Sequence, residues 1–233
     1  MKKVSLLAIL ATVASTAAMA QTPVASAANC PKAFQGFGLK GNIGYGVGVG
    51  KQKVQFVNGE SIKNDLGFNG VDGGIGVDYN HRFCNWALGI AFDANWASTD
   101  GKRTNSSTEI NNPSLLATEK AQLENSLQLY GRAGYVLANM VMPFVGLGWD
   151  NSSWKHTVTA TNHRNSKSKR WNAFLWKAGV DFLATKHVVL GLEYTGTVAG
   201  KEKLGQKTEN GITSSGSFRP QYNKFALTAK LVY

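Results

Sequence analysis

The chain has 233 residues, of which 25 are Lys or Arg and 14 are Asp or Glu, so its formal net charge is +11. This length allows one large domain or two small ones. The basic balance favours polyanionic partners, and the export signal described next makes nucleic acid the weakest choice among them.

The first twenty residues have the three-part pattern of a secretory signal peptide. Lys2 and Lys3 form a basic start, residues 4–14 are apolar and uncharged, and Ala18-Met19-Ala20 fits the rule for cleavage between small residues. The apolar run is shorter than the roughly 20 residues that a membrane-spanning helix needs. We therefore expect residues 1–20 to be removed, which leaves 23 basic and 14 acidic residues and a net charge of +9.

Residues 21–35 are expected to form a short periplasmic segment that contains Cys30. An exported protein meets an oxidising compartment, in which a disulfide can form. Cys30 precedes the first predicted strand, and Cys84 lies in the turn after the second. Both are expected on the same side of the protein, so we predict a Cys30–Cys84 disulfide, and the alternative is two free thiols.

From residue 37 onward, apolar residues recur at every second position, as in half-buried strands. In "FGLKGNIGYGVGV", for example, Phe37, Leu39 and Ile43 share one face, while Lys40 and several glycines share the other. The eight segments with this alternation are residues 37–49, 71–79, 86–96, 127–135, 141–149, 174–182, 188–195 and 224–233.

The connections between these segments alternate in length. Residues 81–85, 137–140 and 184–187 are tight turns, whereas residues 50–67, 99–122, 151–170 and 199–220 are long and polar. Short turns at one end and long loops at the other predict an all-β fold, a closed eight-stranded antiparallel up-and-down barrel over residues 36–233 with four long extracellular loops.

The sizes of the side chains on the two faces indicate which face is inside. Glycines crowd one face and suit the narrow lumen of eight strands, while Trp86, Trp96, Trp149 and Trp176 lie on the other. The aromatic residues also gather in two bands, one near the short turns and one near the long loops. Two such bands are typical of a transmembrane barrel, and a soluble container would show none.

Several segments resemble the OmpA-like and opacity-protein superfamily of small outer-membrane barrels. They are "GFGLKGNIGYGVG" from Gly36, "PFVGLGW" from Pro143, "KAGVDFLATKHVVLGLEY" from Lys177 to Tyr194, and the terminal "LTAKLVY". The resemblance implies a monomer in the outer membrane of a Gram-negative cell, in contact with lipid and lipopolysaccharide. It also implies that the strand ending in Tyr233 is an assembly signal for the barrel-assembly machinery. The peptidoglycan-binding domain of full-length OmpA proteins is missing after Tyr233, so a free-standing barrel is expected.

Ten charged residues fall on the inward face, five of each sign. Since unpaired buried charges are costly, we expect a network of ion pairs in the lumen, with Lys177 facing Glu193. Such a network is either a structural plug or a gated path for ions. The ten residues are Lys40, Asp72, Asp78, Asp93, Arg132, Lys177, Asp181, Glu193, Lys224 and Lys230.

No set of residues indicates catalysis, a metal or another cofactor. The histidines lie at tight turns (His81 and His187) or in a long loop (His156 and His163), and none is placed mid-strand beside a serine and an acid. We therefore expect no enzyme and no cofactor. A lipid-modifying outer-membrane enzyme is the least favoured alternative.

The third long loop is strongly basic and contains no acid. Its height near the outer aromatic band predicts contact with lipopolysaccharide phosphates and with polyanions on a host surface. The alternative is a solvated, disordered loop. A structural or adhesive role follows from this surface, and a narrow ion-conducting porin is the competing function. The basic residues are Lys155, Arg164, Lys167, Lys169 and Arg170.

Overall fold

The computed structural model describes residues 32–56, 61–105, 117–160, 163–200, 202–209 and 212–233. The predicted signal peptide and Cys30 lie outside these residues. Within them, no helix is long and apolar enough to cross a membrane.

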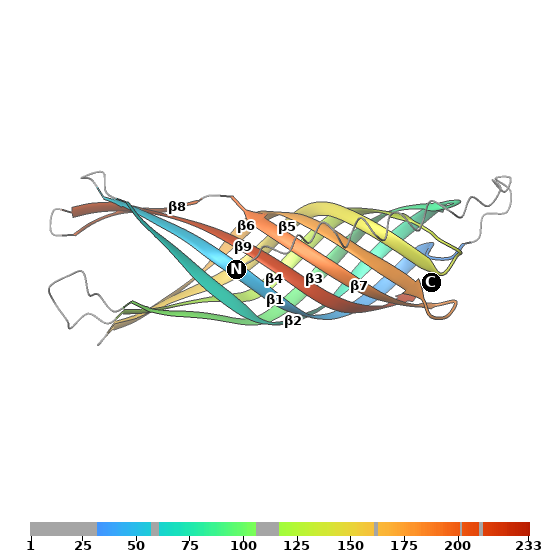
Figure 1. The fold of residues 1–233 in the computed structure, drawn as a ribbon, viewed down its shortest axis with the longest axis horizontal. Coiled ribbons are helices and arrows are strands. Elements are labelled where there is room, and N and C mark those ends of the chain that lie inside the picture. Colours follow the sequence, from blue (N-terminus) through green and yellow to red (C-terminus); the bar gives the residue numbers. More distant parts are fainter. Residues whose placement is uncertain (1–31, 57–60, 106–116, 161–162, 201, 210–211) are drawn as a thin grey trace, which may run out of the picture. The chain divides into compact units, whose positions relative to one another are not determined.

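The regular secondary structure of the described residues consists of antiparallel strands, most of them much longer than the segments predicted from alternation (Figure 1). The strands are β1 (Gly36–Phe56), β2 (Ser61–Phe83), β3 (Trp86–Asn105), β4 (Ala117–Tyr135), β5 (Val141–Ala160), β6 (His163–Leu183), β7 (Val188–Ala199), β8 (Glu202–Glu209) and β9 (Ile212–Val232).

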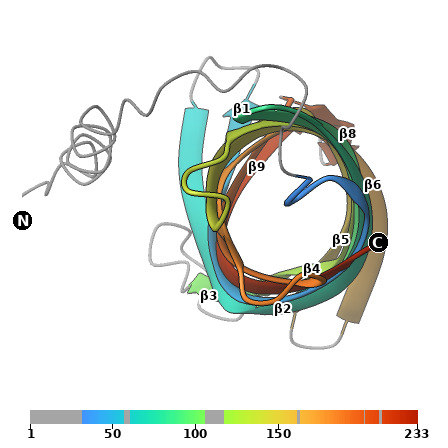
Figure 2. The same cartoon turned by 90° about the vertical axis from the view of Figure 1, so that its right-hand side faces the viewer.

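These strands form one sheet that closes on itself where β1 pairs with β9 (Figure 2). At the closure, the backbone N–H of Tyr233 donates to the carbonyl of Phe37 at 2.8 Å. Both β7 and β8 pair with β9, at different heights, so together they occupy one strand position. The barrel therefore has eight strand positions, and the predicted fold class is confirmed.

Tight turns connect the strands at one end of the barrel, called the short-turn end below. The turn at 137–140 has positive φ at both central residues, Ala138 (48°) and Asn139 (57°), as a type I′ hairpin turn requires. The N–H of Met140 donates to the carbonyl of Leu137 at 3.0 Å. The predicted strands over 127–135 and 141–149, joined by a tight turn at 137–140, are confirmed.

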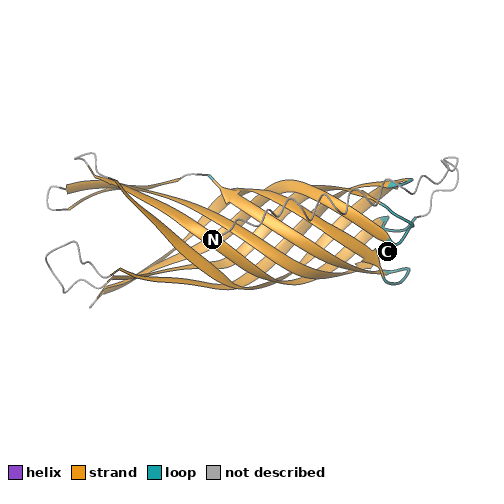
Figure 3. Ribbon diagram, viewed as in Figure 1, coloured by secondary structure: helices purple, strands orange, loops and turns teal. Residues whose placement is uncertain are grey.

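Most of the described residues in the four segments that were predicted to be long loops form strands instead. At this opposite end, called the hairpin end, the strands continue far into the polar segments; β5 and β6, for example, pair as far as Ala160 and His163 (Figure 3). The error has a physical reason. Outside lipid the outward face of a strand contacts water and can be polar, so a paired strand no longer shows regular apolar alternation and its sequence is typical of a loop.

The two faces of the sheet are as the alternation predicted. Phe37, Leu39 and Trp86 are more than half exposed on the outward face, while the alternate positions are buried. Glycines make the interior possible. A Cβ added at Gly46 would collide with the ring of Tyr222, and one at Gly48 with the ring of Phe68. The aromatic side chains thus fill the space that these glycines leave.

Candidate functional site

The lumen contains the ten predicted charged residues, and the structure groups them into three layers. Nearest the short turns, Arg132 donates to Asp78 (3.2 Å) and Asp181 (2.6 Å), and Lys230 also contacts both carboxylates, at 2.6 and 3.3 Å. We call these four residues the turn-end cluster. Two positive and two negative charges make it neutral, and the ring of Phe144 lies 4.0 Å from the Arg132 guanidinium.

The central cluster consists of Lys40, Asp93, Lys177 and Glu193 around the ring of Tyr130. Lys177 lies 2.6 Å from Glu193 and 2.9 Å from Asp93, and Lys40 lies 2.7 Å from Asp93 and 3.4 Å from Glu193. The Tyr130 hydroxyl accepts from Lys40 at 2.9 Å and donates to Asp93 at 3.2 Å. Each lysine therefore bridges two acids, and this layer is also neutral.

The hairpin-end cluster contains the remaining pair, Lys224 and Asp72, in direct contact. Lys224 also donates to Asn42 at 2.8 Å and to Asn95 at 3.1 Å, and Tyr222 donates to Asp72 at 3.2 Å. All ten charged residues are nearly inaccessible to solvent. Each of the three neutral layers crosses the lumen and contains ion pairs between different strands. These ion pairs can therefore hold opposite walls of the barrel together.

Sequence reasoning missed several inward polar residues. Tyr130 and Tyr222 were not assigned to the lumen, although they alternate in phase with Arg132 and Lys224. Asp150 was missed as well, and its carboxylate accepts from Gln128 at 3.1 Å. The phase of the alternation was the available signal, but only the charged residues on the inward phase were assigned to the lumen.

Apolar side chains close the lumen at both ends. At the short-turn end, Phe34, Met142 and Val189 lead a buried cluster that also contains Ala87, Val136 and Val232. At the hairpin end, the aromatic cluster consists of Phe68, Leu123, Trp154, Trp171 and Tyr222. Trp171 alternates in phase with the inward residue Lys177 and is 6 % exposed, so it belongs to the inward side of β6.

Arg82 anchors the segment before β1 at the short-turn end. Its guanidinium donates to the carbonyl of Ala33 (3.2 Å), the side chain of Asn139 (2.6 Å) and the carbonyl of Cys84. Phe34, with φ at 66°, inserts next to this anchor. Cys84 is disulfide-bonded. Its pairing with Cys30 stays a prediction, because Cys30 lies outside the described residues.

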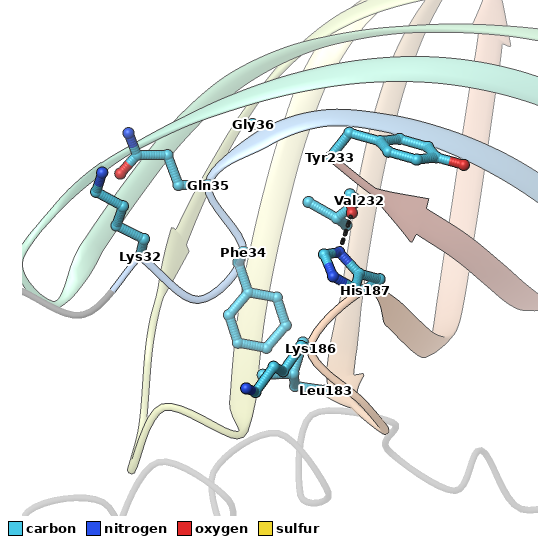
Figure 4. A pocket seen from close by; sticks show the side chains of 9 residues that line it. All are labelled: Lys32, Phe34, Gln35, Gly36, Leu183, Lys186, His187, Val232 and Tyr233. Atoms are coloured by element: carbon cyan, nitrogen blue, oxygen red, sulfur yellow. Dashed lines mark hydrogen bonds between the residues drawn. The ribbon is translucent and has the colours of Figure 1, made fainter.

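A cavity of about 340 Å³ lies at the short-turn end, between Phe34 and the turn that contains His187 (Figure 4). The ring of His187 contacts the backbone carbonyl of Val232 at 3.1 Å, and the ring of His81 packs on Phe83. Where side chains are described, neither imidazole bonds to a serine hydroxyl or a carboxylate. Among the described residues that line the pocket there is no serine, threonine or cysteine.

The five predicted polyanion-contact residues lie on the hairpin of β5 and β6 rather than in a loop. Arg170 is exposed and donates to Asn151 at 2.6 Å and Asn125 at 3.5 Å, and Lys169 lies over the ring of Trp171. Lys155 lies 4.0 Å from Glu124 of β4, an acid that the sequence did not place nearby. The side chains of Arg164 and Lys167 are outside the described set.

Comparison with known proteins identifies the fold. A family model described as "Outer membrane protein beta-barrel domain" matches residues 6–228. No curated protein sequence matches the chain. Among solved structures, the barrel is similar to the outer membrane protease OmpT from Escherichia coli, with 11 % identity, a TM-score of 0.52, and coverage of 91 % of this chain and 99 % of OmpT.

Two further structures match with lower TM-scores. OprG from Pseudomonas aeruginosa shares 13 % identity at a TM-score of 0.49 and covers 85 % of this chain and 97 % of its own. Ail of Yersinia pestis shares 12 % identity at a TM-score of 0.33, with coverage of 82 % and 99 %. The family match extends over nearly the whole chain, and the closed barrel with its apolar outer face agrees with it. The chain therefore belongs to the family of outer membrane proteins with this β-barrel domain.

Proposed function

We propose that this protein is a closed, non-conducting barrel of the outer membrane that acts through its extracellular surface. The observation that carries the proposal is the filled lumen: three neutral ion-pair layers lie between two apolar clusters. Eight strands leave an interior only just wide enough for side chains. A hydrated ion would have to break several buried ion pairs to cross it.

Conductance of the purified protein in planar lipid bilayers tests the closed barrel. We expect no steady conductance, because no layer can open without leaving buried charges unpaired. A reconstituted general porin serves as the positive control, and heat-unfolded protein as the negative control. A steady, sizeable conductance that disappears on unfolding would show that the protein is a narrow pore.

We also propose that the surface contact is made by the hairpin of β5 and β6. Arg170 lies four residues beyond Phe174 on the outward face, which corresponds to roughly 10 Å above the aromatic band for a tilted strand. Lipopolysaccharide phosphates lie at about this height. Asn125 and Asn151 accept hydrogen bonds from the Arg170 guanidinium and so orient it. Because guanidinium groups bind phosphates and carboxylates well, we propose lipid phosphates and acidic polysaccharides as its ligands.

Replacement of Arg164, Lys167, Lys169 and Arg170 by Gln is expected to weaken lipopolysaccharide and heparin binding at least tenfold at low salt. Each basic residue near an anionic surface contributes on the order of 1 kcal/mol, and salt screens this contribution. Binding is measured at low and physiological salt. The matched control replaces four basic residues of other hairpins (Lys102, Arg103, Lys203 and Lys207) by Gln. Equal affinities and equal salt slopes for the two variants would exclude the hairpin as the contact surface.

A further inference from the structure

Toward the hairpin end, the closed barrel separates into two sheets. The ladder between β2 and β3 reaches no further than Asn69 and Asp100, and that between β6 and β7 ends at Ala173 and Ala199. The other strand pairs continue almost to their turns. We call β2-β1-β9-β8 the first hairpin sheet and β3-β4-β5-β6 the second. Figure 1 shows the two groups of strands diverging at the end opposite the C-terminus.

The aromatic cluster holds these sheets together at their base. Phe68 of β2 and Tyr222 of β9 belong to strands of the first hairpin sheet. Leu123 of β4, Trp154 of β5 and Trp171 of β6 belong to strands of the second. The rings of Phe68 and Trp154 meet edge to face, with centroids 4.8 Å apart. These buried aromatic contacts join the two hairpin sheets at their base.

Each hairpin sheet ends in two edge strands. Across the described residues, no further strand pairs with the outer side of β2 over 61–68, β8 over 202–209, β3 over 101–105, or β6 over 163–168. An edge strand presents a row of backbone N–H and C=O groups, which can accept an additional strand from another chain. Proteins that bind extended peptides in this way obtain affinity from the backbone and specificity from the side chains.

Charge distinguishes the four edges. The edge segments of β2 and β8 each contain equal numbers of basic and acidic residues, and the two basic residues of the β3 edge, Lys102 and Arg103, adjoin Asp100. Residues 163–168 of β6 contain Arg164 and Lys167, and no acid lies in or next to them. Lys169 and Arg170 extend the same basic run. A second copy of this chain would bring the same positive charge to the edge, and like charges across a strand pair are destabilising. A suitable partner is therefore acidic.

We propose that the edge of β6 over residues 163–168 binds an extended acidic peptide segment of a partner protein as an added antiparallel strand. This goes beyond the proposed contact with lipid phosphate or polysaccharide. That contact uses side chains, whereas the added strand uses the backbone of β6. The occupant is thus a polypeptide, and its recognition requires N–H groups as well as negative charge.

The test uses a ten-residue probe peptide of alternating Glu and Val and the same peptide with every backbone amide N-methylated. The methylated peptide has the same charge but cannot donate a backbone hydrogen bond. We expect the unmodified peptide to bind the folded barrel at least tenfold more tightly. Amide hydrogen exchange followed by NMR should slow at every second residue of 163–168 and not over 202–209.

Charge reversal gives a second readout. The Arg164→Glu/Lys167→Glu variant is expected to lose at least tenfold in affinity for the unmodified peptide, while the same change at Lys203 and Lys207 on the β8 edge leaves it unchanged. Heat-modifiable gel mobility shows that both variants are folded. Equal binding of the two peptides, no binding, or protection at another edge would overturn the proposal. If the unchanged protein fails the peptide test but still binds heparin, only the added-strand proposal is overturned, and the proposed surface contact stands. The two proposals can therefore be tested independently.

Discussion

Replacement of Lys177 by Met is expected to lower the free energy of unfolding by about 3–5 kcal/mol. Lys177 is fully enclosed and bridges Glu193 and Asp93 in the central cluster. Without it, two buried carboxylates share Lys40 alone, and one negative charge is left without compensation. Removing one partner of a buried ion pair costs far more than the pair itself contributes, because the remaining charge has lost its water and gained no counterion.

Urea unfolding in detergent micelles or lipid vesicles, followed by tryptophan fluorescence, measures this loss. The matched control is Lys186→Met, since Lys186 is exposed in the turn between β6 and β7 and should change stability by about 0.5 kcal/mol or less. The double variant Lys177→Met/Glu193→Gln removes one charge of each sign and should recover part of the loss. A Lys177→Met barrel that unfolds at the same urea concentration as Lys186→Met would contradict a structural role for the central cluster.

Much of the barrel was predictable because lipid imposes a simple rule on each strand. The outward face must be apolar, so Phe37 and Leu39 alternate with small or charged residues, and the tight turns are short interruptions of this alternation. The same rule placed Lys40 and Arg132 inside. Glycine on the inward phase then indicated a narrow lumen, and Gly46 and Gly48 do make room for large rings there.

The contacts across the lumen were less predictable. Lys177 and Glu193 were expected to face each other across one turn, and they do form an ion pair. Their contacts with Asp93 and Lys40 come from strands far away in the sequence and depend on the stagger of the closed barrel. Alternation gives the face of each residue but not this stagger, because every even shift of register preserves the faces.

The long strands at the hairpin end were not predicted, for a different reason. Beyond the outer aromatic band, the ladder between β5 and β6 continues through polar pairs such as Lys155 with Ser168 and Thr157 with Ser166. Their sequence resembles that of a loop, because the strands pair there through backbone hydrogen bonds and have no regular pattern of apolar side chains. Trp154 and Trp171 lie in the inward phase of their strands, but the adjoining segment was predicted to be a long loop, so neither residue was assigned to a face of the sheet.

Replacement of Trp154 by Ala is expected to lower the free energy of unfolding by about 3–5 kcal/mol, the usual range for removing a buried aromatic side chain. Trp154 is 5 % exposed, packs against Phe68 and donates from Nε1 to Ser152 at 3.0 Å. Its ring is a principal contact between the two hairpin sheets, so its loss leaves a cavity where they join. The loss should also speed proteolytic cleavage at the hairpin end, because the sheets then separate more readily.

Trp96→Ala is the matched control for this prediction. Trp96 is 57 % exposed on the outward face, where lipid or detergent fills the space that the ring leaves, so the expected loss is roughly 1 kcal/mol or less. Urea unfolding and limited proteolysis of both variants, reconstituted in lipid vesicles, measure the difference. Equal stabilities and equal cleavage rates would mean that the aromatic cluster does not join the sheets. Greater stability loss and faster cleavage in Trp154→Ala alone would establish that the cluster joins the two hairpin sheets at their base.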